Sequence, residues 1–193
     1  MSRDLLLSTS SLHPHSQLAH SLGLSSWRSV IDHVRHLPYG RTPDKLDFAS
    51  VLTLGRGTCS TKHALLKVIA DENKIEAHLT LCIYKMNHVN TPGIGSLIVD
   101  AGIPYVPEAH CYLKVDEEAI DATLHNADLA SKIEDIIDEE IINPSQISNY
   151  KVDYHKAYLR QWRKEKKLTM SFDELWELRE ACIAKLTPPP PGQ

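Results

Sequence analysis

The feature that most constrains the fold is a change in the spacing of apolar residues near Asn73. Before this point, apolar side chains recur at the three- and four-residue spacing of a helix, at Ala64, Leu65, Val68 and Ile69. After it, apolar and polar residues alternate from 77 to 84, which is the pattern of a half-buried β-strand. Because the helix and the strand must bury their apolar sides together, the chain is expected to mix both kinds of element in one core.

Two later apolar runs predict a hairpin. Residues 110–115 and 119–123 flank the turn-like residues 116–118, a pattern typical of antiparallel strands joined by a tight turn. Residues 96–100 form another short apolar run and are expected to be a strand. These segments predict an α+β fold whose antiparallel sheet has about four strands, with the helix that starts near Cys59 packed on one face.

Further helical patterns lie on both sides of the expected sheet. A short helix and then a longer one are expected within residues 17–37, with a break at 23–26. After the sheet, helices are expected at 129–142, 154–168 and 171–186. The last of these opens with Ser171 and Glu174, which have the spacing of a capping box. The helices are therefore expected to surround the sheet.

The length and composition of the chain favour one globular domain. A chain of 193 residues with 42% apolar and 24% charged residues can bury a single core without disulfides. We expect the domain to span residues 1–187, with a core at 38–123 and helical extensions on both sides. Residues 188–193, which begin with a run of prolines, are expected to be a disordered tail.

Charge, hydropathy and cysteine content limit the partners and the compartment. The net charge is −4 and the isoelectric point is about 6.2, so no global positive field favours nucleic acid as a partner. The early apolar run at residues 5–7 is far shorter than a signal peptide core or the roughly 20 residues of a membrane span. The chain is therefore not expected to contact membranes. Four cysteines without a C-x-x-C pair predict free thiols in a cytoplasmic protein.

Cys59 is expected to stand at the start of a helix, where a thiol can act as a nucleophile. The unpaired N–H groups and the dipole of a helix start favour negative charge and therefore lower the pKa of a thiol there. Gly55 and Gly57 allow the backbone to turn just before it, and the Cys59 N–H can serve as an oxyanion donor. His110 and Asp121 lie on the two strands of the expected hairpin, where their side chains can stand side by side as base and orienting group.

Three short segments carry these residues, in the order Gly57-Thr58-Cys59-Ser60, Ala109-His110-Cys111-Tyr112 and Ile120-Asp121-Ala122-Thr123. In order and setting they resemble the transglutaminase-like superfamily, whose domains have a papain-like, cysteine-proteinase-type fold. The resemblance covers residues 38–123. It implies that Cys59 is the nucleophile, His110 the general base and acid, and Asp121 the orienting carboxylate. It also implies acyl transfer or amide hydrolysis through a thioester, on a peptide, protein or small amide substrate and without a cofactor.

Some assignments stay open at this stage. The family's second oxyanion donor has no clear match, and Gln17, Trp27 and Tyr39 are the candidates. His63 is an alternative base, although one helical turn beyond Cys59 it is expected to point away from the space above the helix start. Asp100 is an alternative orienting group, but turn chemistry explains its position.

A metal site and a binding module are the two alternatives to a cysteine enzyme. The closest histidine groupings do not have the paired spacing of a zinc site, so no metal is expected; they are His13, His15 and His20, and Asp32, His33 and His36. The second alternative is a transglutaminase-like binding module with a silent triad.

Residues 85–95 and 102–107 are expected to border the substrate cleft. The substrate and the oligomeric state are not indicated by the sequence.

Overall fold

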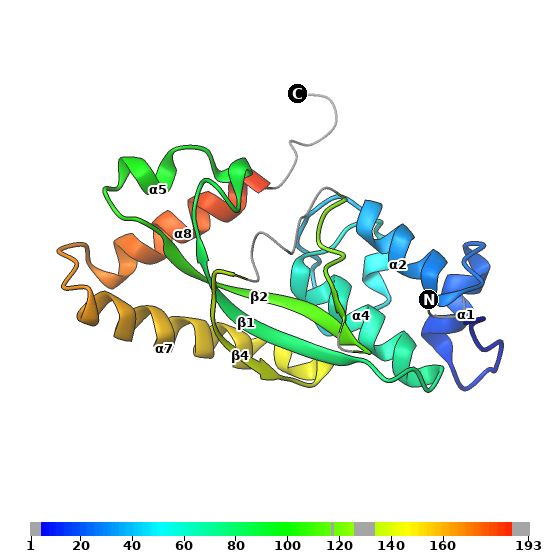
Figure 1. Ribbon diagram of the computed structural model, residues 1–193. Coiled ribbons are helices and arrows are strands. Elements are labelled where there is room, and N and C mark those ends of the chain that lie inside the picture. The colour runs from blue at the N-terminus through cyan, green and yellow to red at the C-terminus, as the bar shows by residue number, and fades with distance from the viewer. Residues whose placement is uncertain (1–4, 117, 126–133, 187–193) are drawn as a thin grey trace, which may run out of the picture.

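A four-stranded antiparallel sheet lies at the centre of the computed structural model, which describes residues 5–116, 118–125 and 134–186 (Figure 1). In the order β3-β2-β1-β4, the strands are β3 Glu118–Ile120, β2 Val106–Val115, β1 His78–Met86 and β4 Ile136–Ile141. The long strands β1 and β2 pair along their whole shared length, from His78 opposite Lys114 to Met86 opposite Val106. The predicted α+β class, the antiparallel sheet of four strands and the β2–β3 hairpin are confirmed, although one of the four strands comes from a segment that was expected to be a helix.

Helices cover this sheet, as expected. They are α1 Pro14–Ser21, α2 Trp27–His36, α3 Ser50–Thr53, α4 Cys59–Glu72, α5 Leu97–Asp100, α7 Asn149–Glu165 and α8 Phe172–Leu186, with short 3-10 helices at Pro92–Ile94 and Pro144–Ile147. The predicted break between the first two helices is confirmed. The capping box is also present, because Ser171 N donates to Glu174 Oε2 at 2.7 Å and Glu174 N donates to Ser171 Oγ at 3.2 Å.

The helix expected at residues 129–142 is wrong for its described part, because residues 136–141 form strand β4. Residues 129–133 lie outside the described ranges. β4 pairs with β1, which otherwise would present an open row of backbone groups at this edge. Isoleucines supply β-propensity here, and the acidic side chains of Asp138, Glu139 and Glu140 lie on an edge strand, where charge discourages pairing with another chain. Tertiary pairing therefore decides the structure of this segment.

Two smaller expectations also fail. The strand expected at residues 96–100 is instead the short helix α5, in which Asp100 N donates to Ser96 O at 2.8 Å. It ends at Asp100, and Gly102, two residues later, has a φ of +69°, which suits glycine. β1 was expected to be half buried, but Leu81 and Cys82, which point to opposite faces of the sheet, are both buried. Other parts of the chain therefore cover both faces of β1.

The apolar interior has two large clusters that share the long strands, beside a small third cluster of Cys82 and Tyr112. The first lies between the sheet and α1, α2 and α4, and includes Leu81 and Ile83 of β1. The second lies among α5, α7 and α8, and includes Tyr84 and Met86 of the same strand. Figure 1 shows α1, α2 and α4 gathered at one end of the sheet and α5 and α8 at the other. β1 therefore connects the two clusters within one continuous element.

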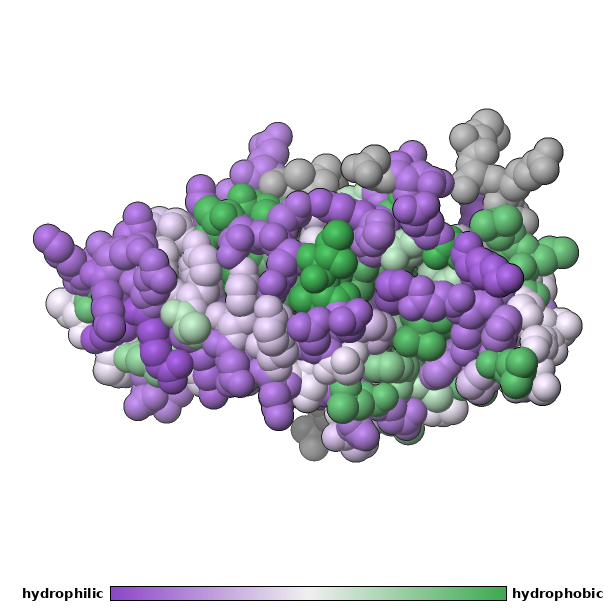
Figure 2. All heavy atoms as spheres, turned by 90° about the horizontal axis from the view of Figure 1, so that it is seen from below, coloured by the Kyte–Doolittle hydropathy of each residue, from purple (hydrophilic) through white to green (hydrophobic). Residues whose placement is uncertain are grey.

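The surface seen from below the view of Figure 1 is mainly polar. Hydrophilic residues cover most of this face, and hydrophobic residues occur in several separate groups (Figure 2). No helix within the described ranges has the length and apolar character needed to cross a membrane. All four cysteines are free thiols, as expected. The proline-rich segment 188–193 lies outside the described residues.

Candidate active site

Cys59 is the first residue of α4, and its local sequence explains why the helix starts there. Thr58 has an extended backbone and caps the helix, with Thr61 N donating to Thr58 Oγ1 at 3.3 Å. Thr61 Oγ1 in turn accepts from Thr58 N at 2.9 Å, so the two threonines form a reciprocal capping box. The N–H of Cys59 lies in the first turn, where helix geometry supplies no backbone acceptor.

The two glycines before Cys59 serve different purposes. Gly55 has a φ of +61°, a conformation that side chains rarely adopt. Gly57 is needed for close packing, because a Cβ there would lie 2.8 Å from Cγ of Lys62. Gly40 N donates to Gly57 O at 3.2 Å, and Gly57 N donates to Pro38 O at 3.3 Å. These bonds hold the segment that carries Tyr39 directly beside the start of α4.

His110 and Asp121 lie side by side, at a distance expected for a base and its orienting group. His110 Nε2 is 2.8 Å from Asp121 Oδ2, and both side chains are buried. Asp121 follows the last residue of β3, so the strand is shorter than the predicted 119–123. The other carboxylate oxygen, Oδ1, accepts from Thr123 N at 2.8 Å. Because Nε2 faces the carboxylate, proton transfer by this ring would use Nδ1.

His63, the alternative base, has both ring nitrogens engaged by the backbone and lies 3.6 Å from Asp121 Oδ1 through Nε2. Its Nδ1 lies 2.7 Å from Cys59 O and its Nε2 accepts from Ala122 N at 2.8 Å. Burial lowers the pKa of His63 to about 4, so the ring is neutral at neutral pH. Lys62 also binds this loop, because its Nζ donates to Thr123 O at 2.7 Å as well as to Leu37 O at 2.6 Å. The two side chains fix the loop that carries Asp121 against α4.

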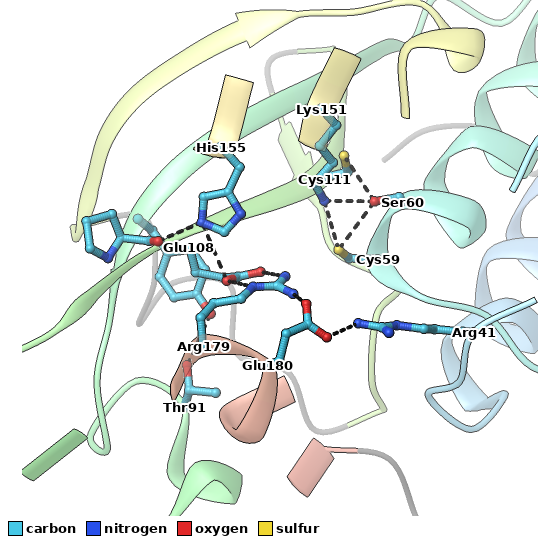
Figure 3. A network of polar contacts seen from close by, with 12 residues as sticks. Arg41, Cys59, Ser60, Thr91, Glu108, Cys111, Lys151, His155, Arg179 and Glu180 are labelled. Atoms are coloured by element: carbon cyan, nitrogen blue, oxygen red, sulfur yellow. Dashed lines mark hydrogen bonds and ion pairs between the residues drawn. The ribbon is translucent and has the colours of Figure 1, made fainter. Parts of the chain in front are cut away.

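A buried lysine that sequence analysis missed contacts the candidate nucleophile. Lys151, in the first turn of α7, lies with its Nζ 3.5 Å from Cys59 Sγ and donates to Ser60 Oγ at 2.7 Å (Figure 3). It makes no ion pair with a carboxylate in the described part of the chain. When the thiol of Cys59 loses its proton, the negative charge of the thiolate would therefore balance the ammonium of Lys151.

The surroundings favour the thiolate at Cys59 and the thiol at the other cysteines. Burial raises the pKa of Cys59, but Lys151 and His110, together with hydrogen bonds, lower it well below its ordinary value. Burial raises the pKa of Cys82, of Cys182, and of Cys111 to about 11. Of the four thiols, Cys59 alone is poised to react as a thiolate near neutral pH.

A cavity of about 270 Å³ opens beside Cys59, and its walls differ from the expected cleft borders. It is lined by Tyr39, Arg41, Lys45, Thr58, Cys59, Ser60, Glu108, Ile147, Lys151, Val152, His155, Trp176, Arg179, Glu180 and Ile183. Residues 85–95 and 102–107 do not line it, so the expected borders are wrong for this cavity. The reason is that α7 and α8 supply nearly half of the lining residues, and the segment from Tyr39 to Lys45 and the start of α4 supply most of the others. Figure 3 shows Lys151 and His155, from α7, and Arg179 and Glu180, from α8, together at the site.

The candidates for a second oxyanion donor and for an alternative orienting group lie in different parts of the structure. Of the three candidates for a second oxyanion donor, Tyr39 lines the cavity, whereas Trp27 is buried in the first apolar cluster and Gln17 is exposed. Asp100 is exposed at the end of α5, accepts a hydrogen bond from Ser96 Oγ at 2.7 Å and does not line the cavity. Within the described ranges, no group of three His, Cys, Asp or Glu side chains could hold a metal ion.

A sequence signal for Lys151 exists, but it depends on where the helix begins. The buried positions of α7 are Lys151, His155, Leu159 and Trp162, which follow the spacing of one helix face. The helix was predicted to begin at residue 154, whereas α7 begins at Asn149. The predicted helix therefore does not include Lys151, which continues the buried stripe. A charged side chain on the buried face of a helix is unusual enough to indicate a site.

Comparison of this chain with protein-family models, with curated proteins and with solved structures found no match.

Proposed function

We propose that the chain is a cysteine-dependent acyltransferase or amide hydrolase that works through a thioester. The observation that carries the proposal is the meeting of four groups from separate segments: Cys59 at a helix start, the hydrogen-bonded pair of His110 and Asp121, and Lys151 beside the sulfur. The order of the three sequence segments, and a nucleophile helix packed on an antiparallel sheet, support a transglutaminase-like, cysteine-proteinase-type fold.

The proposed reaction has two steps. In the first, His110 takes the thiol proton, Cys59 Sγ forms a bond to the carbonyl carbon, and the bond to the leaving amine breaks as His110 returns the proton to it. In the second, water or another amine gives a proton to His110 and attacks the thioester carbon, the C–S bond breaks, and His110 returns the proton to the sulfur as the acid or new amide leaves. The Cys59 N–H and the Tyr39 hydroxyl, which lines the same cavity, are the groups available to hold the oxyanion.

Mass spectrometry of the wild type and Cys59→Ala tests this function. Both proteins are incubated with amide, ester and glutamine-peptide donors, with and without a primary amine. We expect an acyl adduct or a product that is lost in Cys59→Ala but kept in the matched control Cys182→Ala, because Cys182 lies in the second apolar cluster. Dependence of the product on the amine separates a transferase from a hydrolase. No Cys59-dependent change with any donor would favour the silent binding module instead.

A further inference from the structure

The cavity beside Cys59 has an unusual balance of charge. Its lining includes four cationic side chains and two carboxylates, which are Arg41, Lys45, Lys151, Arg179, Glu108 and Glu180. Ligand cavities commonly measure roughly 300–1,000 Å³, so a cavity of about 270 Å³ suits a small group and not a folded segment. The charges that remain unpaired in so small a space should therefore decide which group enters.

Both carboxylates are already used by the two arginines. Glu108 is held by Arg179 through two contacts, one of them a 2.7 Å bond from Nε. Arg179 Nη1 also lies 2.6 Å from Glu180, and Arg41 lies 2.6 Å from the other oxygen of Glu180. The result is a chain of alternating charges whose sum is zero (Figure 3). It leaves the two lysines as the uncompensated cations of the cavity.

Lys45 lies on the exposed side of the cavity without a carboxylate partner. In the described part of the chain it makes no ion pair or side-chain hydrogen bond, and Glu180 acts on it only at longer range. Partial burial lowers the pKa of Lys45, and the positive charges of Lys151, Arg41 and Arg179 lower it further. Lys45 therefore stands in a positive field that an anion would relieve.

Lys151 loses its counter-charge when the proposed reaction proceeds. In the free protein, the Cys59 thiolate can balance this buried ammonium at 3.5 Å. Once Cys59 carries an acyl group, the sulfur is a neutral thioester, and the hydroxyl of Ser60 and the thiol of Cys111 are the contacts that remain. Glu108 still acts on the ammonium at longer range, but it is already paired with Arg179, so an acyl group with its own negative charge would restore the balance.

We infer that the cavity accepts an acyl group that bears a carboxylate, with Lys45 and Lys151 as the cations that hold it. This inference rests on the proposed function, because it concerns the acyl group that Cys59 would carry. It names the class of substrate as an acidic acyl donor. A neutral acyl group of the same shape would leave both lysines uncompensated and is expected to be disfavoured.

A pair of alkylating reagents tests the preference without knowledge of the substrate. In both, the Cys59 thiolate forms a C–S bond and iodide leaves, but iodoacetate carries a carboxylate where iodoacetamide carries a neutral amide. The rate with iodoacetate is divided by the rate with iodoacetamide at Cys59, as measured by mass spectrometry, and the result is divided by the same ratio for glutathione. We expect this normalised ratio to be about ten or more, because a positive cleft concentrates anions by roughly 10- to 1,000-fold.

Substitution of one lysine assigns the preference to the cavity. We expect Lys45→Gln to lower the normalised ratio several-fold and Lys45→Arg to keep it. Lys164→Gln is the matched control, because it removes the same charge from an exposed position of α7 about 20 Å along the helix from Lys151. Its ratio should equal that of the wild type.

The outcomes separate this inference from the proposed function. If Cys59 reacts quickly but the normalised ratio is near one, or Lys45→Gln changes it no more than Lys164→Gln, the acidic substrate class is wrong and the nucleophile stands. If neither reagent labels Cys59 faster than the other three cysteines of the folded protein, the proposed nucleophile is wrong, and the inference falls with it.

Discussion

Lys151 is the single residue expected to influence the ionisation of Cys59 most. Its ammonium lies 3.5 Å from Sγ and lowers the pKa of the buried thiol. We expect Lys151→Met to raise that pKa and to slow iodoacetamide labelling at pH 7 by about tenfold or more, since opposite charges about 4 Å apart are worth on the order of 4 kcal/mol at a partly screened site. Labelling at high pH should approach the wild-type rate, because the thiolate then forms without help.

Rates of labelling from pH 5 to pH 10, followed by mass spectrometry, check this expectation. The matched control is Lys164→Met, which removes an exposed lysine of the same helix. An unchanged pH profile in Lys151→Met would mean that the lysine contacts the sulfur without setting its ionisation.

Single residues also show what the sequence can and cannot predict. Cys59 follows a helix cap and His110 lies in a strand, so local patterns indicate each of them. Lys151 is separated from Cys59 by 92 residues, and their contact depends on how α7 crosses the sheet. Tertiary contacts of this kind leave only an indirect trace, in this case a charged residue on a buried helical stripe.

At the scale of elements, the ion pair between Glu108 of β2 and Arg179 of α8 joins the sheet to the C-terminal helix. Burial raises the pKa of Glu108, but Arg179 and then His155 lower it below its ordinary value. The pair therefore contributes stability above the unfolded pKa of about 4.3, and this contribution is lost as the pH falls towards the folded pKa. The sign means that acid weakens the contact between β2 and α8.

Arg179→Met is expected to reverse this dependence on pH. Without the guanidinium, burial dominates and raises the pKa of Glu108, so the unpaired carboxylate costs most at neutral pH. We expect a loss of about 3–5 kcal/mol at pH 7, and a smaller loss at pH 5, where the carboxyl group can bind a proton. Urea unfolding at both pH values measures this.

The control for that experiment is the double variant Glu108→Gln with Arg179→Met, which leaves no buried charge from the pair and should lose less stability at pH 7. Equal losses for Arg179→Met at pH 7 and pH 5 would contradict the assignment of the cost to a buried charge.

Elements were predicted well where local signals are strong and poorly where pairing decides. The capped helix α4 and the β2–β3 hairpin follow from short-range patterns. β4 carries an acidic sequence that also suits a helix, and it becomes a strand because β1 pairs with it. The prediction of the cavity walls was wrong for the same reason. Loops that are near His110 in the sequence were expected to line the cavity, but residues of α7 and α8, which are distant in the sequence, line it instead.

At the scale of the whole molecule, the two apolar clusters share β1 and β2, and this arrangement predicts how the chain unfolds. Leu81 and Ile83 belong to the first cluster, and Met86 of the same strand belongs to the second. A strand that is paired on both sides cannot lose one end without disturbing the ladder at the other. The two clusters are therefore expected to unfold together, as the prediction of one domain requires.

Met86→Ala and two tryptophan probes test this coupling. Trp27 lies in the first cluster and Trp162 in the second, so single-probe chains can be made by changing the other tryptophans to phenylalanine. Because Met86 is fully buried, its truncation should cost about 2–5 kcal/mol. We expect the urea midpoints reported by the two probes to coincide before the substitution and to fall together after it. If Met86→Ala moved the midpoint of Trp162 and left that of Trp27 in place, the two clusters would be separate folding units, and the candidate active site, which combines Cys59 of α4 with Lys151 of α7, would be lost when either one unfolds.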